Sequence, residues 1–285
     1  MRPPGETASP YLRRVDAITA GLAQIDTWGA PHAAAATVGP DGILASRGDI
    51  HREFALASVT KLVLAVAVLV AHEERSLDLD DAAGPPGSTV RHLLAHASGL
   101  AFEGAAPLGP PATTRIYSNR GYEVLGERLE ACTGMTAAEY LHEAVAVPLG
   151  MSATELRGSP AHGAVSCVAD LALLAAELLT AGTILAPTTV EAARTVQFPG
   201  LRGIVPGFGM QVANDWGLGP EIRDAKGPHW TGSRNSPATF GHFGRSGTFV
   251  WVDPDAGRAL VCLTDREFDE WAKGAWPRLS DAVLD

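Results

Sequence analysis

A serine and a lysine, Ser58 and Lys61, stand three residues apart at the start of the most apolar stretch of the chain, "FALASVTKLVLAVAVLV". If residues 58–74 form a helix, the two side chains share one face, with β-carbons about 5–6 Å apart. Burial among leucines and valines lowers the pKa of a lysine. A neutral amine can take the serine proton and make its oxygen nucleophilic. The other interpretation, a Ser58 helix cap and a lysine that reaches solvent, needs no chemistry.

Two later motifs add groups that suit acyl transfer. In "IYSNRGYEVLGERLE" a phenol, Tyr117, can carry a proton if a nearby cation lowers its pKa, and the Asn119 amide can bind a lysine or a substrate carbonyl. In "FGHFGRSGTFVW" we expect His242 and Gly244 on one face of a strand, where glycine lets a ligand lie against the backbone. The alternatives are a buried tyrosine beside a helix cap, and a glycine-rich edge strand with an incidental histidine.

Taken in this order, the three motifs resemble those of the serine β-lactamase and penicillin-binding-protein superfamily, closest to its class C and esterase branch. Three further stretches are similar to that family: "VRHLLAHASGL", which is like its "LLTHTSGL", the helix "VADLALLAAELLTAG", and the terminal hairpin "HFGRSGTFVWVDPDAGRALVCLTDR". The resemblance covers roughly residues 10–275.

The resemblance implies an α/β (α+β) fold of the β-lactamase/transpeptidase type, in which helices flank an antiparallel sheet and an all-helical lobe lies beside it. Residues 1–285 would form one domain, with a sheet lobe over about 9–78 and 200–285 and a helical lobe over about 79–199. The apolar spacing agrees with this order. It predicts helices at 9–26, 58–74, 89–96, 119–133, 136–146, 168–181, 187–196 and 266–284, a hairpin formed by "AAAATV" and "GILASRGD", two strands within residues 239–265, and a long ordered loop over 200–238.

The resemblance also implies the roles of the site residues. Ser58 matches the acylated nucleophile, Lys61 its base partner, and Tyr117 the second proton carrier, which serves the leaving group. Asn119 would contact Lys61 and the substrate. The backbone N–H groups of Ser58 and Arg245 would form the oxyanion hole.

One departure from the family pattern bears on the substrate. The third motif usually reads Lys-Thr/Ser-Gly, whose lysine and hydroxyl favour a substrate carboxylate, whereas this chain has His242 and Phe243 there. That change favours esters or amides without a carboxylate, although Arg245 or Arg234 can supply an anion contact. We also expect the loop "PHWTGSRNSP", with Trp230 and Arg234, to form a wall of the substrate pocket.

Composition narrows the remaining classes. A net charge of −10 over 285 residues disfavours nucleic acid or an anionic membrane as a partner. The three cysteines lie far apart, and His92 and His96 have no carboxylate motif beside them, so we expect no metal and no cofactor. The longest apolar run, 62–71, is too short to span a bilayer. The first 22 residues lack the apolar core of a signal peptide, which predicts a cytoplasmic location.

These observations predict a serine hydrolase that forms an acyl-enzyme on Ser58 and hydrolyses a small ester or amide. Its partner would be a small-molecule ester, amide or lactam, and no particular oligomeric state is indicated. The alternative is an acyltransferase that passes the acyl group to an amine or alcohol. A true β-lactamase or D-Ala-D-Ala peptidase, or a non-catalytic binding protein on the same fold, agrees less well with the motifs.

Overall fold

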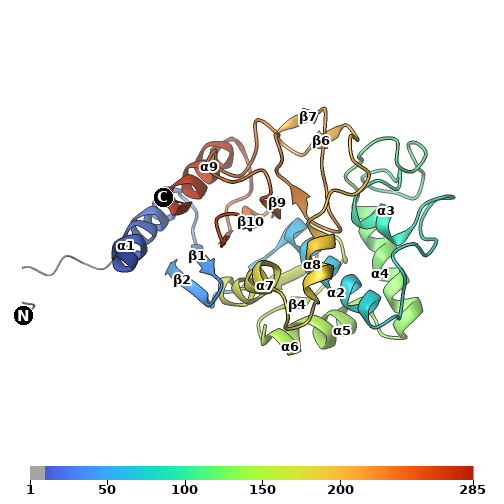
Figure 1. The fold of residues 1–285 in the computed structure, drawn as a ribbon, viewed down its shortest axis with the longest axis horizontal. Coiled ribbons are helices and arrows are strands. Elements are labelled where there is room, and N and C mark those ends of the chain that lie inside the picture. The colour runs from blue at the N-terminus through green and yellow to red at the C-terminus, as the bar shows by residue number, and fades with distance from the viewer. Residues whose placement is uncertain (1–9, 285) are drawn as a thin grey trace, which may run out of the picture.

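A six-stranded antiparallel sheet forms the centre of the fold in this computed structural model, which describes residues 10–284 (Figure 1). In spatial order its strands are β2 (Gly42–Arg47), β1 (Ala33–Gly39), β11 (Arg258–Thr264), β10 (Thr248–Asp253), β9 (Phe240–Gly244) and β8 (Glu221–Ile222). β1 pairs with β11, with Ala36 opposite Val261. The predicted sheet, built from both ends of the chain, is therefore confirmed.

Both faces of this sheet are covered by helices. One layer consists of α1 (Pro10–Leu22) and α9 (Glu270–Leu284), which lie side by side near the two termini (Figure 1). The opposite layer contains α7 (Val168–Thr180) and α2 (Thr60–Glu73). Successive strand residues point to opposite faces, so Phe249 and Trp251 pack in the first layer and Val250 and Val252 in the second. This double burial explains why β10 and β11 are almost continuously apolar.

The α2 helix is buried on all sides, from Thr60 to Ala71. A helix that is apolar all round lies in a protein core, and α2 packs between the sheet and the helices α4 (Asn119–Thr133) and α5 (Ala137–Leu141). The predicted helix at 58–74 differs at its start, because residues Ala57–Val59 form a 3₁₀ turn that carries Ser58. The nucleophile candidate therefore lies just before the α-helix.

The remaining helices agree with the sequence pattern in type and roughly in length. They are α3 (Val90–Leu94) and α8 (Pro187–Ala193), whereas the short helix α6 (Val147–Leu149) was not predicted. The predicted helix at 136–146 is split, because His142–Ala146 form a π-helical segment between α5 and α6. Residue 9, where the first predicted helix begins, lies outside the described residues. The division into a sheet lobe and a helical lobe stays a prediction, as does the single domain.

Two strand predictions were wrong in part. The segment 200–238 is not only loop: it contains β8 and a small hairpin of β6 (Gly203–Val205) and β7 (Gly209–Gln211). Residues 239–265 form three strands rather than two, since a turn at 245–247 separates β9 from β10. Strands of two or three residues are too short to show an alternating pattern. A last small sheet contains β3 (Phe54–Ala55), β5 (Ala164–Ser166) and β4 (Glu155–Leu156).

Within residues 10–284, no helix has both the length and the apolar character needed to cross a lipid bilayer.

Candidate active site

The turn that carries Ser58 is held tightly against the β9–β10 hairpin. Ala57, directly before Ser58, has a φ of 46°, a left-handed conformation that costs energy for a residue with a side chain. Thr248 Oγ1 on β10 donates a hydrogen bond of 2.9 Å to the Leu56 carbonyl oxygen. This bond ties the strained turn to the sheet.

Gly244 permits this close approach. A β-carbon at that position would lie 2.3 Å from the Leu56 carbonyl oxygen and 3.2 Å from the Ala57 β-carbon. Only glycine can therefore end β9 here without pushing the Ser58 turn away. The backbone of Arg245 follows at once, which brings together the two peptide segments expected to supply the oxyanion hole.

Lys61 is fully buried on the first turn of α2, and its amine faces three oxygen atoms. Nζ donates to Asn119 Oδ1 (2.7 Å) and to the Ala161 carbonyl oxygen (2.8 Å), and it lies 3.4 Å from Ser58 Oγ. A neutral amine has two N–H bonds and one lone pair. The two acceptors use both N–H bonds, so the lone pair is left for the Ser58 hydroxyl.

The surroundings of Lys61 favour this neutral form. Burial lowers its pKa to about 7, and the carboxylates of Glu103 and Glu123 oppose that shift only in part. Glu103 acts from the far side of Asn119, whose Nδ2 donates to Glu103 Oε1 (2.8 Å). Near neutral pH, a large fraction of the molecules thus holds Lys61 as a base.

Tyr117 differs from the sequence-based expectation. Its hydroxyl interacts with the Ser58 side chain, and Lys61 Nζ lies 4.8 Å from its ring centroid. Burial nevertheless raises the pKa of Tyr117 well above its ordinary value. The expected lowering by a nearby cation is absent, because the same burial that traps Tyr117 also neutralises Lys61. Tyr117 therefore keeps its proton and can serve as a donor.

His242 on β9 is buried and uncharged. Its Nδ1–H donates to the Phe243 carbonyl oxygen (2.8 Å), which fixes the tautomer with an unprotonated Nε2. Burial, reinforced by the nearby Lys61, lowers the pKa of His242 to about 3. A histidine in this state offers no positive charge to an anion.

Ser58, Tyr117 and His242 line a cavity of about 260 Å³ with largely aromatic walls. The lining residues are Ser58, Phe102, Tyr117, Pro206, Gly207, Trp216, Glu221, His242, Phe243, Arg245 and Phe268. Trp216 was not singled out as a pocket residue; it is buried, and it also forms part of this wall. Phe102, Glu221 and Phe268 were not singled out either, because they carry no short-range motif.

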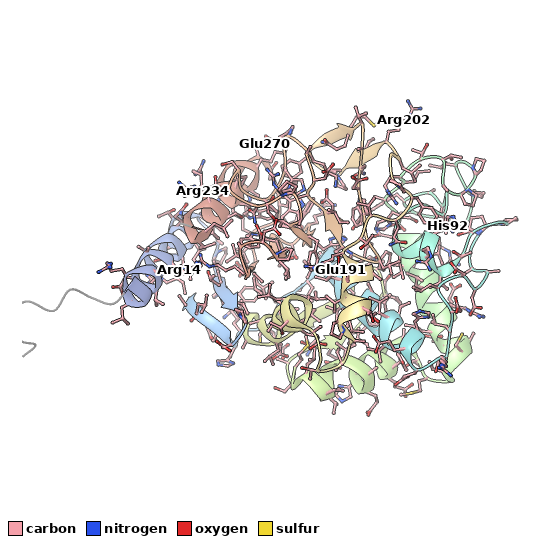
Figure 2. All side chains as sticks on the ribbon, in the orientation of Figure 1. Arg14, His92, Glu191, Arg202, Arg234 and Glu270 are labelled. Carbon is pink, nitrogen blue, oxygen red and sulfur yellow. The ribbon has the colours of Figure 1, made fainter. Side chains whose placement is uncertain are left out.

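Two residues expected in the pocket wall are elsewhere. Trp230 is 1% exposed, packs in the core beside α9, and donates from Nε1 to Glu221 Oε2 (2.7 Å) behind the cavity. Arg234 lies at the surface beside α9 (Figure 2), where its backbone N–H donates to Asp281 Oδ1 (2.8 Å). Neither side chain lines the cavity. Arg245 does, with a largely exposed side chain that lies 3.7 Å from the Glu267 carboxylate.

A second buried charged cluster lies directly behind the site. Glu221 on β8 accepts hydrogen bonds from Trp230 and pairs with Lys226 and His229, each at 3.3 Å. Burial alone would raise the pKa of Glu221, but Lys226 and His229 outweigh it and lower the pKa to about 2. The carboxylate is therefore a fixed negative charge with a fixed counter-charge.

The two histidines first considered as metal ligands have other partners. His92 closes a capping box with Thr89 at the start of α3 and stacks on Phe198, with ring centroids 4.2 Å apart. His96 Nδ1 accepts from the Ser118 backbone N–H (3.1 Å), just after Tyr117. Across residues 10–284 no group of three or more histidine, cysteine or acidic side chains is placed to hold a metal ion.

The part of the chain that carries Ser58, Lys61 and Tyr117 matches a known protein family. The family model described as Beta-lactamase matches residues 51–284. The chain therefore belongs to the β-lactamase family of serine hydrolases. Penicillin-binding protein 4* of Bacillus subtilis is 28% identical over 36% of this chain, and that match spans only 30% of the Bacillus protein.

Solved structures agree with this assignment. A β-lactamase of Mycobacterium bovis is 55% identical, with a TM-score of 0.91 over 93% of this chain and 98% of that one. EstCE1, described as a hydrolase with promiscuous acyltransferase activity, is 18% identical, with a TM-score of 0.77 over 96% and 98% of the two chains. Simvastatin synthase of Aspergillus terreus is 17% identical, with a TM-score of 0.78 over 99% and 98%. The last two show a shared fold.

Proposed function

We propose that this chain is a class C-like esterase or amidase that forms an acyl-enzyme on Ser58 and hydrolyses a small uncharged substrate. The observation that carries the proposal is the amine of Lys61, which is buried, has its pKa lowered to about 7 and lies 3.4 Å from Ser58 Oγ, with two other oxygens to take its N–H bonds. A base of this pKa is half deprotonated at neutral pH, which suits general base catalysis.

The proton path follows from the protonation states of the free site. Ser58 Oγ attacks the carbonyl carbon while its proton moves to Lys61 Nζ. The backbone N–H groups of Ser58 and Arg245 bind the oxyanion, a contribution of about 10²–10³ in rate for each donor. When the intermediate collapses, Tyr117 gives its proton to the leaving group and recovers one from Lys61. Water then attacks the acyl-enzyme with the same groups in reverse, and Asn119 holds Lys61 and the substrate.

The substrate preference rests on the third motif. His242 is neutral and Phe243 has no hydroxyl, so a substrate carboxylate at this end of the cavity would lie poorly paired, which is costly. We therefore expect short neutral esters or amides to react better than penicillins or cephalosporins. Because this chain is similar to the Mycobacterium bovis β-lactamase, lactams must be compared with esters as substrates. Arg245, which lines the cavity, is the group that can still bind a substrate carboxylate.

Acyl transfer is the second candidate. The aromatic walls can hold an acceptor and keep water from the acyl-enzyme, and the fold is shared with an acyltransferase-active hydrolase. The cytoplasmic location from the sequence remains part of the proposal. A D-Ala-D-Ala peptidase or a binding protein without catalysis has less support.

Labelling with a fluorophosphonate probe tests the nucleophile. The chain should be labelled once, at Ser58, and Ser58→Ala should abolish labelling while Ser46→Ala, a change on the exposed edge strand β2, should not. Wild-type labelling of the Ser58→Ala protein would overturn the proposal.

Turnover then tests the substrate class. We expect p-nitrophenyl butyrate to be hydrolysed with a higher kcat/KM than nitrocefin at equal enzyme concentration. Efficient nitrocefin turnover with negligible ester cleavage would reverse the preference. Products formed with an added amine or alcohol would separate hydrolysis from acyl transfer.

A further inference from the structure

One buried polar atom of a residue that lines the cavity has no internal partner. His242 is only 3% exposed, and its Nε2 forms no hydrogen bond with any residue between 10 and 284. A buried nitrogen of this kind ordinarily has a partner, because its desolvation otherwise costs about 1–3 kcal/mol. Since His242 lines the cavity beside Ser58, a bound molecule can supply that partner.

His242 Nε2 can act only as a hydrogen-bond acceptor. The Nδ1–H bond to the Phe243 carbonyl oxygen leaves Nε2 with a lone pair and no hydrogen. The low pKa of His242 keeps it in that form throughout the working pH range. Nε2 can therefore accept a hydrogen bond but cannot donate one.

The neighbouring groups reinforce this restriction. The His242 ring lies 5.9 Å from the ring of Tyr117 and 5.5 Å from Trp216, centroid to centroid, so the acceptor is framed by aromatic faces. Glu221 also lines the cavity, but it is a carboxylate that already pairs with Lys226 and His229. A carboxylate beside Nε2 would set lone pair against lone pair, because Nε2 has no hydrogen to donate.

We propose that the substrate of this site carries an N–H or O–H group that donates to His242 Nε2, together with an aromatic or branched apolar group that fills the rest of the cavity. This inference rests on the proposed function, because the bound molecule is a substrate only if Ser58 forms an acyl-enzyme with it. Tyr117 interacts with Ser58, and its ring lies 5.9 Å from the ring of His242, so the donor group and the scissile carbonyl would belong to one bound molecule. His242 thus selects a hydrogen-bond donor, whereas a lysine at this position would bind a carboxylate.

Three small ligands isolate the donor group. Benzyl alcohol has an O–H donor, benzyl methyl ether has the same ring and oxygen but no donor, and phenylacetate has a carboxylate. Dissociation constants are measured by ligand-observed NMR with the full chain bearing Ser58→Ala, so that no reaction occurs. We expect benzyl alcohol to bind about 3- to 10-fold more tightly than the ether, the value of one net hydrogen bond, and phenylacetate to bind most weakly.

Variants of His242 locate the effect. His242→Leu should make the alcohol and the ether bind equally, whereas the control His92→Leu, on α3 away from the cavity, should preserve the difference. His242→Lys should move phenylacetate from the weakest to the strongest ligand. Equal binding of alcohol and ether with His242 present, or an unchanged preference in His242→Leu, would overturn the proposal. If either variant fails to fold, the three ligands on the His242 protein still decide.

The binding experiment also separates the two proposals. Loss of fluorophosphonate labelling at Ser58 would remove the proposed acyl-enzyme without changing the order of the three ligands. The reverse result, normal labelling with no preference for a donor, would remove only the inference about His242.

Discussion

Lys61 and Lys226 are both buried, and their surroundings differ in one respect. Lys61 is hydrogen-bonded to an amide oxygen and a carbonyl oxygen, both neutral, and its pKa falls to about 7. Lys226 also donates to carbonyl oxygens, those of Asp215 and Ile222, but it faces the Glu221 carboxylate at 3.3 Å as well. Burial lowers the pKa of Lys226 too, while Glu221 opposes that change.

The difference shows how one residue type serves two purposes in the same core. A buried ammonium group without a directly bonded carboxylate gains too little from neutral oxygens to offset its lost hydration, so it gives up its proton easily. With a carboxylate in contact, the charged pair persists and holds segments of the chain together. The first arrangement leaves a neutral amine beside Ser58, and the second holds β8 in place.

The largest expected effect comes from exchanging each lysine for methionine. Lys61→Met removes the base and should slow acylation by about 10²–10⁴-fold or more. Lys226→Met leaves the buried Glu221 without its ammonium partner, which should lower the free energy of unfolding by about 3–5 kcal/mol, while the molecules that remain folded keep most of their reactivity. Urea unfolding and the probe-labelling rate per folded molecule measure the two quantities. Matching rate losses in both variants would erase the distinction between the lysines.

A second prediction tests whether Lys61 works with Tyr117 as one proton-transfer unit. Lys61→Ala and Tyr117→Phe should each cost several orders of magnitude in acylation rate. Groups that act as a unit are not additive, so the double variant should lose little more than the worse single variant. Single-turnover labelling gives the three rates. A double variant whose loss equals the product of the single losses would separate the two roles.

The pH dependence should follow the pKa of Lys61. The base must be unprotonated, so kcat/KM for an ester should rise about tenfold per pH unit at acidic pH and level off above about pH 7. Since burial raises the pKa of Tyr117, no fall is expected in the range where tyrosine ordinarily ionises. A profile measured between pH 5 and 10 checks both statements. A midpoint near the ordinary lysine value would mean that Lys61 behaves like an exposed amine.

The smallest effect concerns the carboxylate that acts on Lys61 through Asn119. Glu103→Gln removes a negative charge that raises the pKa of Lys61, yet it can still accept the bond from Asn119. The midpoint of the pH profile should therefore move to lower pH by less than about one unit, and added salt should shrink the difference. Glu127→Gln, which affects a carboxylate paired with Arg120, is the matched control and should leave the midpoint in place.

The sequence predicted the parts of this site that depend on short-range spacing. Ser58 and Lys61 meet because they are three residues apart where a helix begins. Of the two neutral oxygens that accept hydrogen bonds from Lys61, only that of Asn119 could be predicted, from its motif. The Ala161 carbonyl oxygen gave no signal, because any residue supplies one.

The second wall of the cavity was harder to predict for a physical reason. Residues 200–238 form short strands and turns without a repeating pattern, so the partners of Trp216, Glu221 and Trp230 depend on tertiary packing. Trp230 looked like a pocket residue, but its indole N–H needs an acceptor and finds Glu221 in the interior. Long-range polar pairing of this kind cannot be read from spacing.

The position of Trp216 has an optical consequence. An indole in the cavity wall, in contact with the rings of His242 and Tyr117, changes its emission when a bound molecule alters the polarity around it. Trp230, Trp251 and Trp276 are buried and do not line the cavity, so they contribute a nearly constant background. The chain thus carries its own fluorescent reporter of occupancy, which can follow ligand entry in real time without a label.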